Sequence, residues 1–532
     1  MKKALFVGVL LVVSALATSM INASNDEMNL PILRNAEKIE PTILKLGTTS
    51  AQGNVLITPN SPEDDILPTL TVDGNDNIIV TWTHVVSPVE ADVGLAYSTD
   101  GGTTFESQVV QLDGYQYYAD TAYVEGSKYE GPAYDGLWGV CLESVTESGN
   151  IWLIPDITNP DTWQFYILGE GYLPGATYAC IEDDSWYPMV YFEGVIGPVA
   201  FYIDDDQGMD DGWMLFWYAG DLSGLVYNWD AESVLDTAPA QDPDMACIHD
   251  GDPAWTENDF FYCVAQHNNE KTGHAEIVFK KDIPVQEADI EFVADQYYLA
   301  TGDYDAAHPD VDASGSNVVV VYMSNENGNW DVICAYSHDN AATWNFSTVA
   351  GSPDDEMYPA VYVSGNTVYV VYAKNGNLYL VKSTDGGATW EEPLQINEQD
   401  GTVVMQENYI DICSRGIVWV DNRNGNNDVY FSTFPAPIVV IQGVTGGFGV
   451  KATIANIGSL PAYNVDWSVD LSGLVFVGSH SEGTIDELGP GESVEVGPGF
   501  VFGFGPTTIT VTAAGQTFTA SGFVLGPLVL GL

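Results

Sequence analysis

Short stretches of apolar or alternating residues follow one another along most of this chain. Residues 69–72, 78–82 and 93–97 are rich in Val, Ile, Leu, Thr and aromatic side chains, and Gly, Asn, Asp and Pro lie between such stretches. This arrangement is typical of β-strands joined by tight turns. No long segment has the 3.6-residue period of an amphipathic helix. The pattern therefore predicts an all-β protein.

A unit of three expected strands recurs between residues 51 and 434. Its clearest copy has strands at 68–72, 77–82 and 92–98, and further copies begin at Pro309 and Pro359. Repetition of one small unit indicates an array of similar sheets. Four-stranded sheets packed in a ring would protect their edges, which is how a strand-rich chain of this kind remains soluble.

The number of units follows from the first strand of each. These strands are expected near residues 72, 141, 180, 247, 313, 363 and 412. That gives seven units; six is the alternative, because the interval 141–180 is short and 113–136 is a candidate insertion. A further strand at 55–58 precedes the first full unit, and it is expected to complete the last sheet and close the ring.

Three segments share the motif S-x-D-x-(G/A)-x-T-(W/F): residues 98–105, 337–344 and 383–390. The Asp can accept hydrogen bonds from backbone N–H groups further along, and the small residue permits a tight turn. The closing aromatic residue is expected to be buried against its neighbours. The residues expected to build these turns are Asp100, Gly102, Thr104, Phe105, Asp339, Thr343, Trp344, Asp385, Gly387, Thr389 and Trp390.

These turns resemble the Asp-box, or BNR repeat, of sialidase-like β-propellers. One copy departs from the family pattern, because Ala341 stands where the family has Gly. The resemblance implies a sialidase-like β-propeller over residues 51–434, with the Asp-boxes on its rim and away from an active site. It implies a fold rather than an activity.

The pattern of the sequence changes after residue 437. The proline-rich segment Pro435-Ala436-Pro437 predicts a stiff linker at 435–437. Residues 438–532 contain short alternating stretches that predict a β-sandwich. The pieces N-x-G at 456–458, W-S-V at 467–469 and L-x-P-G-E at 488–492 resemble adhesion-type (CARDB-like) immunoglobulin-like domains. That resemblance implies a spacer or adhesion module.

The N-terminal segment predicts export. A basic start, an apolar run over residues 4–17 and small residues after it are typical of a secretory signal peptide, here expected at 1–23. Residues 24–50 are expected to form a polar lead-in. The protein is therefore expected to be secreted or associated with the cell surface. Six cysteines in an exported chain leave two alternatives open, buried thiols or one or two disulfides.

Charge narrows the choice of partner. The chain has 75 acidic and 14 basic residues, which gives a net charge of −61. Nucleic acids and anionic membranes are polyanions, so neither is expected to be a partner. A salty habitat, an acid habitat and cation binding are three explanations of the charge, and a plain solvated acidic surface is the simpler alternative.

The resemblance to sialidases does not extend to their chemistry. That family binds its anionic sugar with three arginines, whereas this chain has three arginines in all: Arg34, Arg415 and Arg423. Arg34 belongs to the lead-in, and Lys is a poor substitute for a bidentate guanidinium. We therefore assign no catalytic residue. Other glycoside hydrolases need only two placed carboxylates. Carboxylates at expected inner-strand ends are Asp73, Asp135, Glu182, Asp250 and Asp312.

Two further groups are candidates for binding. An acidic loop at 204–212 has oxygen ligands at alternate positions and Gly at its turns, which suits Ca²⁺; a plain solvated loop is the alternative. The candidate calcium ligands are Asp204, Asp206 and Asp210. Tyrosines crowd the candidate insertion, and aromatic rings can stack on sugars, with local packing as the alternative. The candidates for ligand contact are Tyr115, Tyr117 and Tyr118.

The sequence as a whole predicts an exported, non-catalytic binding protein. A seven-bladed β-propeller would recognise a cell-surface glycan or protein, and an immunoglobulin-like sandwich would act as spacer or adhesion module. Two alternatives stay open: a glycoside hydrolase of sialidase-like fold that uses paired carboxylates, and a structural component of a surface layer. The fold by itself does not choose among them.

Overall fold

The structure is a computed structural model, and it divides the chain into two compact units, Met1–Thr433 and Phe434–Leu532. The predicted signal peptide lies outside the described residues. The linker predicted at 435–437 falls just beyond the division. The residues described are 37–50, 53–112, 114–124, 136–143, 148–167, 178–181, 196–204, 211–219, 227–235, 240–248, 260–282, 296–437, 439–456, 458 and 460–531.

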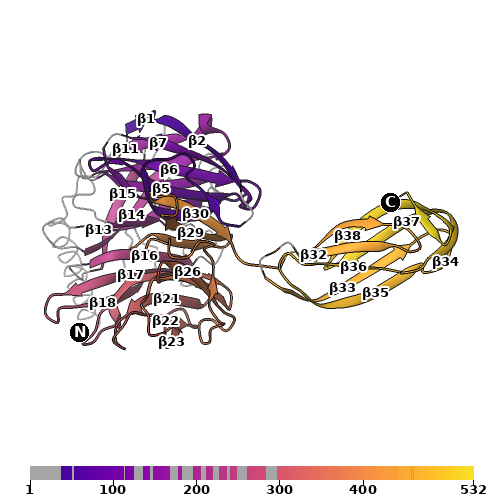
Figure 1. Cartoon of the computed structure of the whole chain (residues 1–532). Coiled ribbons are helices and arrows are strands. Elements are labelled where there is room, and N and C mark those ends of the chain that lie inside the picture. Colours follow the sequence, from indigo (N-terminus) through magenta and orange to yellow (C-terminus); the bar gives the residue numbers. More distant parts are fainter. Residues whose placement is uncertain are drawn as a thin grey trace, which may run out of the picture. The chain divides into compact units, whose positions relative to one another are not determined.

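Within the described residues, the first unit forms seven antiparallel sheets of four or five strands (Figure 1). From the inside outward, the first sheet contains β4 (Asp64–Val72), β5 (Ile78–Ser87), β6 (Glu90–Ser98), β7 (Thr104–Gln111) and β2 (Thr42–Ser50). The second sheet contains β8 (Gln116–Val124), β9 (Gly136–Glu143), β10 (Ser148–Ile154), β11 (Gln164–Ile167) and β1 (Glu37–Ile39). The third sheet contains β12 (Tyr178–Ile181), β13 (Ile196–Asp204), β14 (Asp211–Ala219) and β15 (Tyr227–Leu235), and the fourth contains β16 (Ala240–Ile248), β17 (Phe260–Asn269), β18 (His274–Asp282) and β19 (Tyr297–Ala300). The fifth sheet contains β20 (Ala306–Ser314), β21 (Asn317–Ser324), β22 (Asp331–Ser337) and β23 (Asn345–Ala350). The sixth contains β24 (Glu356–Ser364), β25 (Thr367–Lys374), β26 (Asn377–Ser383) and β27 (Leu394–Gln395). The seventh contains β28 (Ile410–Cys413), β29 (Gly416–Asp421), β30 (Asp428–Thr433) and β3 (Val55–Leu56).

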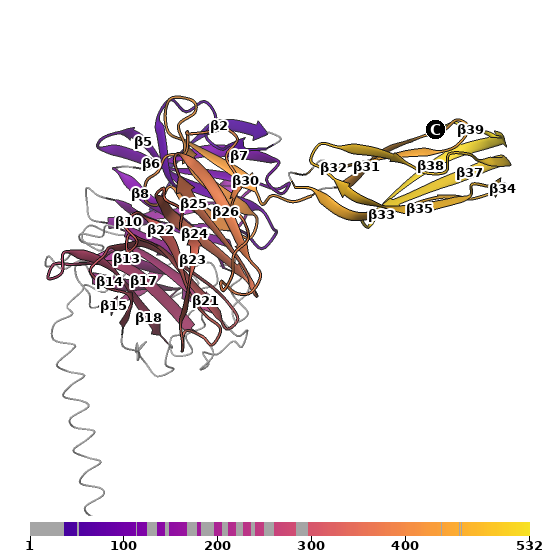
Figure 2. The same ribbon diagram turned by 60° about the horizontal axis from the view of Figure 1, so that its bottom comes forward.

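The seven sheets form a closed ring. The inner strand of each sheet contacts the inner strand of the next, from β4 through β8, β12, β16, β20 and β24 to β28, and β28 contacts β4 again. Two of these inner strands, β8 and β24, are labelled in Figure 2. Each sheet is a meander, so consecutive strands run from the axis to the rim. This arrangement is a β-propeller. The seven inner strands surround a central channel.

Strand β3 closes the ring by pairing with β30, in the register Val55↔Phe431. Side chains reinforce the junction: the Thr58 hydroxyl donates to Asp428 Oδ1 at 3.3 Å, and the Asn54 amide donates to the Ile396 carbonyl at 3.1 Å. The expectation that the segment after residue 54 completes the last sheet is confirmed.

Two expectations about the first unit are wrong. The described residues of the candidate insertion 113–136 include β8, which is the inner strand of its sheet, and Cys141 lies on the second strand β9 rather than on a first strand. Strand β8 has Gln, Tyr, Asp and Thr at most positions, and its buried apolar residues include the small Ala119 and Ala122. Its sequence therefore lacks the strongly apolar pattern of a buried strand. Part of the lead-in also belongs to the sheets, since β1 and β2 add outer edges. Polar edge strands of this kind resemble loops in sequence.

Neighbouring sheets share apolar cores. Every residue of β21 is buried, because this strand has sheet neighbours on both sides and packs against adjacent sheets on both faces. Trp82 is fully buried against Gly94, where an added Cβ would lie 1.8 Å from the indole ring. Cys263 and Cys334 are also buried. These continuous apolar strands fix the sheets around the channel.

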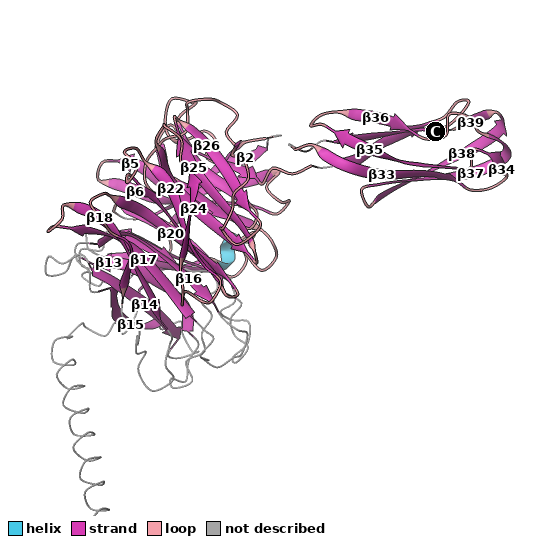
Figure 3. Ribbon diagram, turned by 90° about the horizontal axis from the view of Figure 1, so that it is seen from below, coloured by secondary structure: helices cyan, strands magenta, loops and turns pink. Residues whose placement is uncertain are grey.

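The described residues of the second unit form two antiparallel sheets over one aliphatic core (Figure 3). One sheet has the order β31 (Val439–Thr445), β32 (Lys451–Asn456) and β36 (Ser493–Val496). The other has β35 (His480–Leu488), β33 (Ala462–Leu471), β37 (Phe502–Ala513), β38 (Gln516–Gly526) and β39 (Leu528–Leu530), and β34 (Val475–Val477) pairs with β37. Both sheets contribute to the core, with Ile454 from one and Val469 and Ile509 from the other, all fully buried.

Helix is nearly absent from the described part of the chain, where the one helical segment is the short 3₁₀ turn η2 (Pro160–Thr162) (Figure 3). None of the described residues form a helix of the length and hydropathy needed to cross a membrane.

Candidate functional site

The three Asp-box turns have one hydrogen-bond pattern on the rim. Asp339 accepts the Thr343 N–H at 2.8 Å and the Thr343 hydroxyl at 2.7 Å, and the Ser337 hydroxyl also donates to it. The same bonds join Asp100 to Thr104 and Asp385 to Thr389. Hydrogen bonds from the threonine side chain hold the pKa of Asp339 and of Asp385 down at about 2. The Asp-box carboxylates therefore stabilise their own turns.

The closing aromatic residues pack toward the preceding sheet. Phe105 is fully buried against Phe431, with ring centroids 5.0 Å apart. Trp344 stacks edge-on against Phe279, also at 5.0 Å, whereas Trp390 donates from its indole N–H to the Ser347 hydroxyl at 2.9 Å. The expectation of full burial is wrong for Trp344 and Trp390, which are half-buried. Both indole N–H groups nevertheless have protein partners, because Trp344 donates to the Tyr297 hydroxyl at 2.7 Å as Trp390 does to Ser347.

The inner strands bend at one repeated position at the start side of the channel. Strands β4, β8, β16, β20 and β24 each have a register shift there, which marks a β-bulge. One non-glycine residue of each bulge, and one just before β28, has φ between 48° and 55°. These residues are Leu67, Tyr118, Asp242, His308, Tyr358 and Asn408. Left-handed backbone is unfavourable for such side chains, so the ring of bulges stores strain at the channel.

Four aspartates line the channel just beyond the bulges: Asp120, Asp244, Asp310 and Asp411. Three of them accept a backbone N–H from the inner strand of the next sheet, each at 2.6 Å. The pairs are Asp244 with Val311, Asp310 with Val361, and Asp411 with Leu70. The carboxyl groups therefore join neighbouring sheets.

Burial raises the pKa values of these channel carboxyls. For Asp411, burial and the nearby charge of Asp120 raise the pKa to about 8. The pKa of Asp310 is raised well above its usual range by burial and by the charge of Asp244, whose own pKa burial also raises. Among these carboxyls, Asp411 is the one whose pKa of about 8 lies above neutral pH, so it is expected to hold its proton there.

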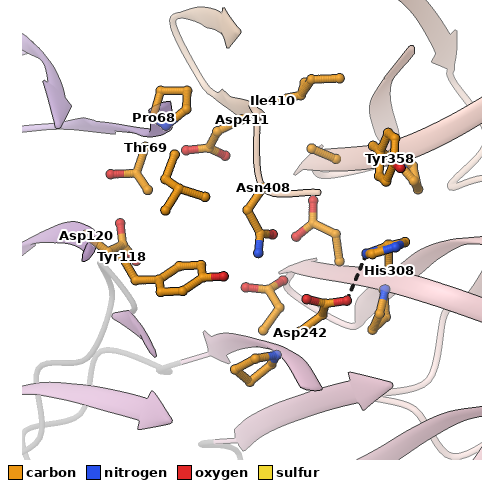
Figure 4. A pocket seen from close by; sticks show the side chains of 17 residues that line it. Pro68, Thr69, Tyr118, Asp120, Asp242, His308, Tyr358, Asn408, Ile410 and Asp411 are labelled. Atoms are coloured by element: carbon orange, nitrogen blue, oxygen red, sulfur yellow. Dashed lines mark ion pairs between the residues drawn. The ribbon is translucent and has the colours of Figure 1, made fainter. Parts of the chain in front are cut away.

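Two cavities lie on either side of the four aspartates. The start-side cavity, about 150 Å³, is lined by the bulge residues and their neighbours (Figure 4). The end-side cavity, about 420 Å³, is lined by the last residues of the inner strands, such as Ser314, Ser364 and Ser414. In an antiparallel meander the Asp-box turns lie on the side where the inner strands end. The start-side cavity is therefore on the face opposite to the Asp-boxes.

Three possible metal ligands meet beside the start-side cavity. Asp242 lies on β16, His308 on β20, and Glu407 just before β28. His308 Nδ1 lies 2.8 Å from Asp242 Oδ2 (Figure 4). It also lies 3.6 Å from Glu407 Oε2. The Tyr358 ring packs edge-on against the imidazole, with centroids 5.1 Å apart. This arrangement can hold a cation or form a charged pair.

The candidate tyrosines lie near the same cavity. Tyr118 points into the start-side cavity from β8, and Asn408 lies across from it (Figure 4). Tyr117 contacts Tyr118 with ring centroids 5.2 Å apart, and Tyr115 contacts Tyr117 at 6.2 Å. The structure therefore places one of the three tyrosines in a cavity wall and the others beside it.

The other candidates do not form a common site among the described residues. Asp73 accepts the backbone N–H groups of Asn75 and Asn77 in a turn, and Asp312 lines the end-side cavity. Arg415 pairs with Asp76, and Arg423 makes a bidentate pair with Asp421 at 2.6 Å and 2.9 Å. The remaining candidates lie outside the described residues, or in strand positions whose side chains are not described: Asp135, Glu182, Asp204, Asp206, Asp210, Asp250 and Arg34.

Sequence reasoning missed the channel residues. Asp244 and Asp310 each follow a proline at the same place in their sheets, in the pairs Pro243-Asp244 and Pro309-Asp310. Pro68-Thr69 and Pro359-Ala360 occupy the equivalent register. Alignment of these Pro-x pairs would have located the bulge and the channel-facing position after it. His308 and Asp242 precede two of these prolines and could have been found in the same way.

The fold and this channel define a β-propeller protein with a carboxylate-lined axis. No protein-family model and no curated protein matches the chain. Solved structures similar to it include a protein of unknown function from Dyadobacter fermentans, at 10% identity and TM-score 0.41 over 74% of this chain and 98% of that one. The Trypanosoma rangeli sialidase is similar at 8% identity and TM-score 0.35, over 86% and 84% of the two chains.

A third similar structure is the β-propeller domain of the Trilobed protease from Pyrococcus furiosus, at 7% identity and TM-score 0.37, over 69% of this chain and 93% of that domain. The structural neighbours are thus sialidases and other β-propeller proteins at low identity. Neither an activity nor a ligand for this chain follows from the likeness.

Proposed function

We propose that this chain is an exported binding protein, in which a seven-bladed, sialidase-like propeller recognises a glycan or a protein at the cell surface. The main observation behind the proposal is that the channel carboxyls accept hydrogen bonds that join neighbouring sheets. Asp244, Asp310 and Asp411 each accept a backbone N–H of the next sheet at 2.6 Å. Groups that hold sheets together are poorly placed to exchange protons with a substrate.

The start-side cavity supports recognition. Tyr118 and Tyr358 offer ring surfaces there, and Asn408 offers amide donors and acceptors (Figure 4). Aromatic rings combined with a few polar groups are typical of sites that bind sugars or polar side chains. At about 150 Å³ the cavity suits one end of a glycan or one side chain, rather than a whole oligosaccharide.

The second unit would serve as an immunoglobulin-like spacer or adhesion module. It exposes aromatic residues around β34, β37 and β38, where Phe502 and Phe504 meet edge-to-face at 5.5 Å. Phe476 is 65% exposed and Leu525 is 53% exposed. Apolar exposure of this kind supports a surface that contacts another molecule.

A glycan array probed with the full chain, beside a hydrolysis screen on the same sugars, tests the proposal. We expect binding without turnover, and Tyr118→Ala should weaken binding several-fold, up to about tenfold. Tyr463→Ala is the matched control, because Tyr463 is 61% exposed on the other unit. Equal binding by the wild type and Tyr118→Ala would move the recognition surface elsewhere.

One observation favours a hydrolase as the second candidate. The pKa of Asp411 is raised to about 8 by burial and by the charge of Asp120, so its carboxyl carries a proton at neutral pH. A protonated carboxyl is what a glycosidase uses as general acid. Turnover of any sugar in the screen that disappears in Asp411→Asn would establish this alternative and reject the non-catalytic proposal.

A further inference from the structure

Three side chains converge at the start side of the channel from three separate segments. The ligand atoms of Asp242, His308 and Glu407 all lie within 4.8 Å of one another. Asp242 and His308 occupy equivalent bulge positions on the neighbouring strands β16 and β20, with φ of 48° and 50°. Glu407 approaches from the segment before β28. No local turn explains this meeting of donors, because they are far apart in the sequence.

Two polar side-chain atoms of Asp242 and His308 lack hydrogen bonds among the described residues. Asp242 is only 4% exposed, and its Oδ1 has no partner; His308 Nδ1 also has none. His308 Nδ1 and Asp242 Oδ2 approach to 2.8 Å, but without the geometry of a hydrogen bond. A buried carboxylate oxygen without a partner is unfavourable. A cation between the donors would satisfy both groups.

We propose that Asp242, His308 and Glu407 bind a divalent transition-metal ion at the start side of the channel. The imidazole nitrogen disfavours Ca²⁺ and Mg²⁺, which prefer oxygen ligands. One imidazole with two carboxylates suits Zn²⁺ and similar ions. Ligands about 2.1 Å from a tetrahedral ion lie about 3.4 Å apart. The distances of 2.8 Å and 3.6 Å at His308 therefore require only small side-chain adjustments.

The surroundings suit a bound ion with an open position. Three protein ligands leave at least one coordination site for water or another ligand. Asp242 and His308 line the start-side cavity, so that site would face the cavity. The edge-on Tyr358 ring helps to fix the orientation of the imidazole. The site is separate from the acidic loop at 204–212, and the inference does not depend on which ligand the propeller binds.

Calorimetric titration of the chelator-treated full chain with Zn²⁺ tests the proposal. Excess Mg²⁺ should be present, because 75 acidic residues will otherwise bind Zn²⁺ non-specifically. We expect one tight site per chain in the wild type. His308→Ala and Asp242→Asn should abolish it, and Glu407→Gln should weaken it by at least tenfold. His274→Ala is the control, because His274 lies 3.1 Å from Asp305 and belongs to no cluster of three possible metal ligands among the described residues.

Equal Zn²⁺ binding by the wild type and Glu407→Gln would overturn the proposal, as would a wild type that binds no Zn²⁺ in excess Mg²⁺. In the latter case Asp242 and His308 form only a charged pair. Glu407→Gln protects the test against misfolding, since the Glu407 side chain is 32% exposed. The titration needs no glycan, so a negative glycan array would leave its result unaffected.

Discussion

Aspartates on the rim and in the channel of this propeller have opposite properties. On the rim, Asp339 and Asp385 are solvent-exposed, accept hydrogen bonds within their own turns and have pKa values near 2. In the channel, Asp310 and Asp411 accept hydrogen bonds from the next sheet and have raised pKa values. The same kind of side chain thus stabilises a turn where its pKa is lowered and a ring junction where its pKa is raised. The Asp-box turns therefore lie on the rim, whereas the aspartates with raised pKa values lie in the channel.

The largest expected effect comes from removing a channel carboxyl. Asp411→Ala takes the side-chain acceptor from the N–H groups of Leu70 and Ile412, which it receives at 2.6 Å and 2.7 Å. Backbone donors left without a partner should lower the free energy of unfolding by about 2–4 kcal/mol. Denaturant unfolding measures this change. Asp385→Ala should destabilise less, because water can replace the lost bonds at the rim.

Asp411→Asn is the control for that comparison, since its amide oxygen can still accept one N–H. It should be less destabilising than Asp411→Ala. Equal losses of stability for Asp411→Ala and Asp385→Ala would contradict the distinction between channel and rim.

A pair of glycines tests whether the rim turn is attached to the neighbouring sheet. Gly101 and Gly102 both have positive φ, 71° and 87°, so Ala should cause similar backbone strain at either position. A Cβ at Gly102 would lie 2.4 Å from the Phe431 ring, whereas at Gly101 nothing lies within 4 Å. Gly102→Ala should therefore be more destabilising than Gly101→Ala, by about 1–2 kcal/mol. Identical melting temperatures for the two variants would show that the turn is not packed there.

A further test of the comparison is the pH dependence of stability. An acid whose pKa is raised on folding binds more protons in the folded state, so stability falls as pH rises from about 4, the unfolded value, toward the folded value. For Asp411 the folded pKa is about 8. Rim aspartates have the opposite sign, since a pKa near 2 adds stability above pH 4 that is lost as the pH falls toward 2.

Calorimetry of the wild type and Asp411→Asn between pH 4 and pH 8 separates this contribution from the general repulsion of a highly acidic chain. The melting temperature should fall with pH in both proteins, and more steeply in the wild type. Parallel curves would mean that Asp411 does not titrate abnormally.

Much of the fold was accessible from sequence, because second and third strands such as β21 and β25 are buried and form clear apolar runs. Strand β8 was missed because a channel strand can be polar: its side chains alternately face the channel, where Asp120 and Tyr118 lie, and small core positions such as Ala119. The outer strands β1 and β2 were missed because they are edges.

The candidate site was predicted only in part. Tyr118 was chosen for its aromatic ring, although the strand that holds it was taken for an insertion. The four channel aspartates and the Asp242–His308–Glu407 cluster depend on register between residues that are about 65 to 290 positions apart in the sequence. Single residues at such distances have no shared local pattern. Alignment of the Pro-x pairs could have brought Asp242, Asp244, His308 and Asp310 together. Asp120, Glu407 and Asp411 have no such proline beside them.

Because β3 closes the ring, it determines when during synthesis the first unit can finish folding. The Thr58 hydroxyl accepts the Val429 N–H, a contact across 371 residues. A nascent chain shorter than this has no partner for β3, and its first and last inner strands, β4 and β28, lack their mutual contact. The entropy of closing so long a loop grows only slowly with length, but pairing across it is slow. The unit should therefore acquire its full stability late and all at once, rather than sheet by sheet.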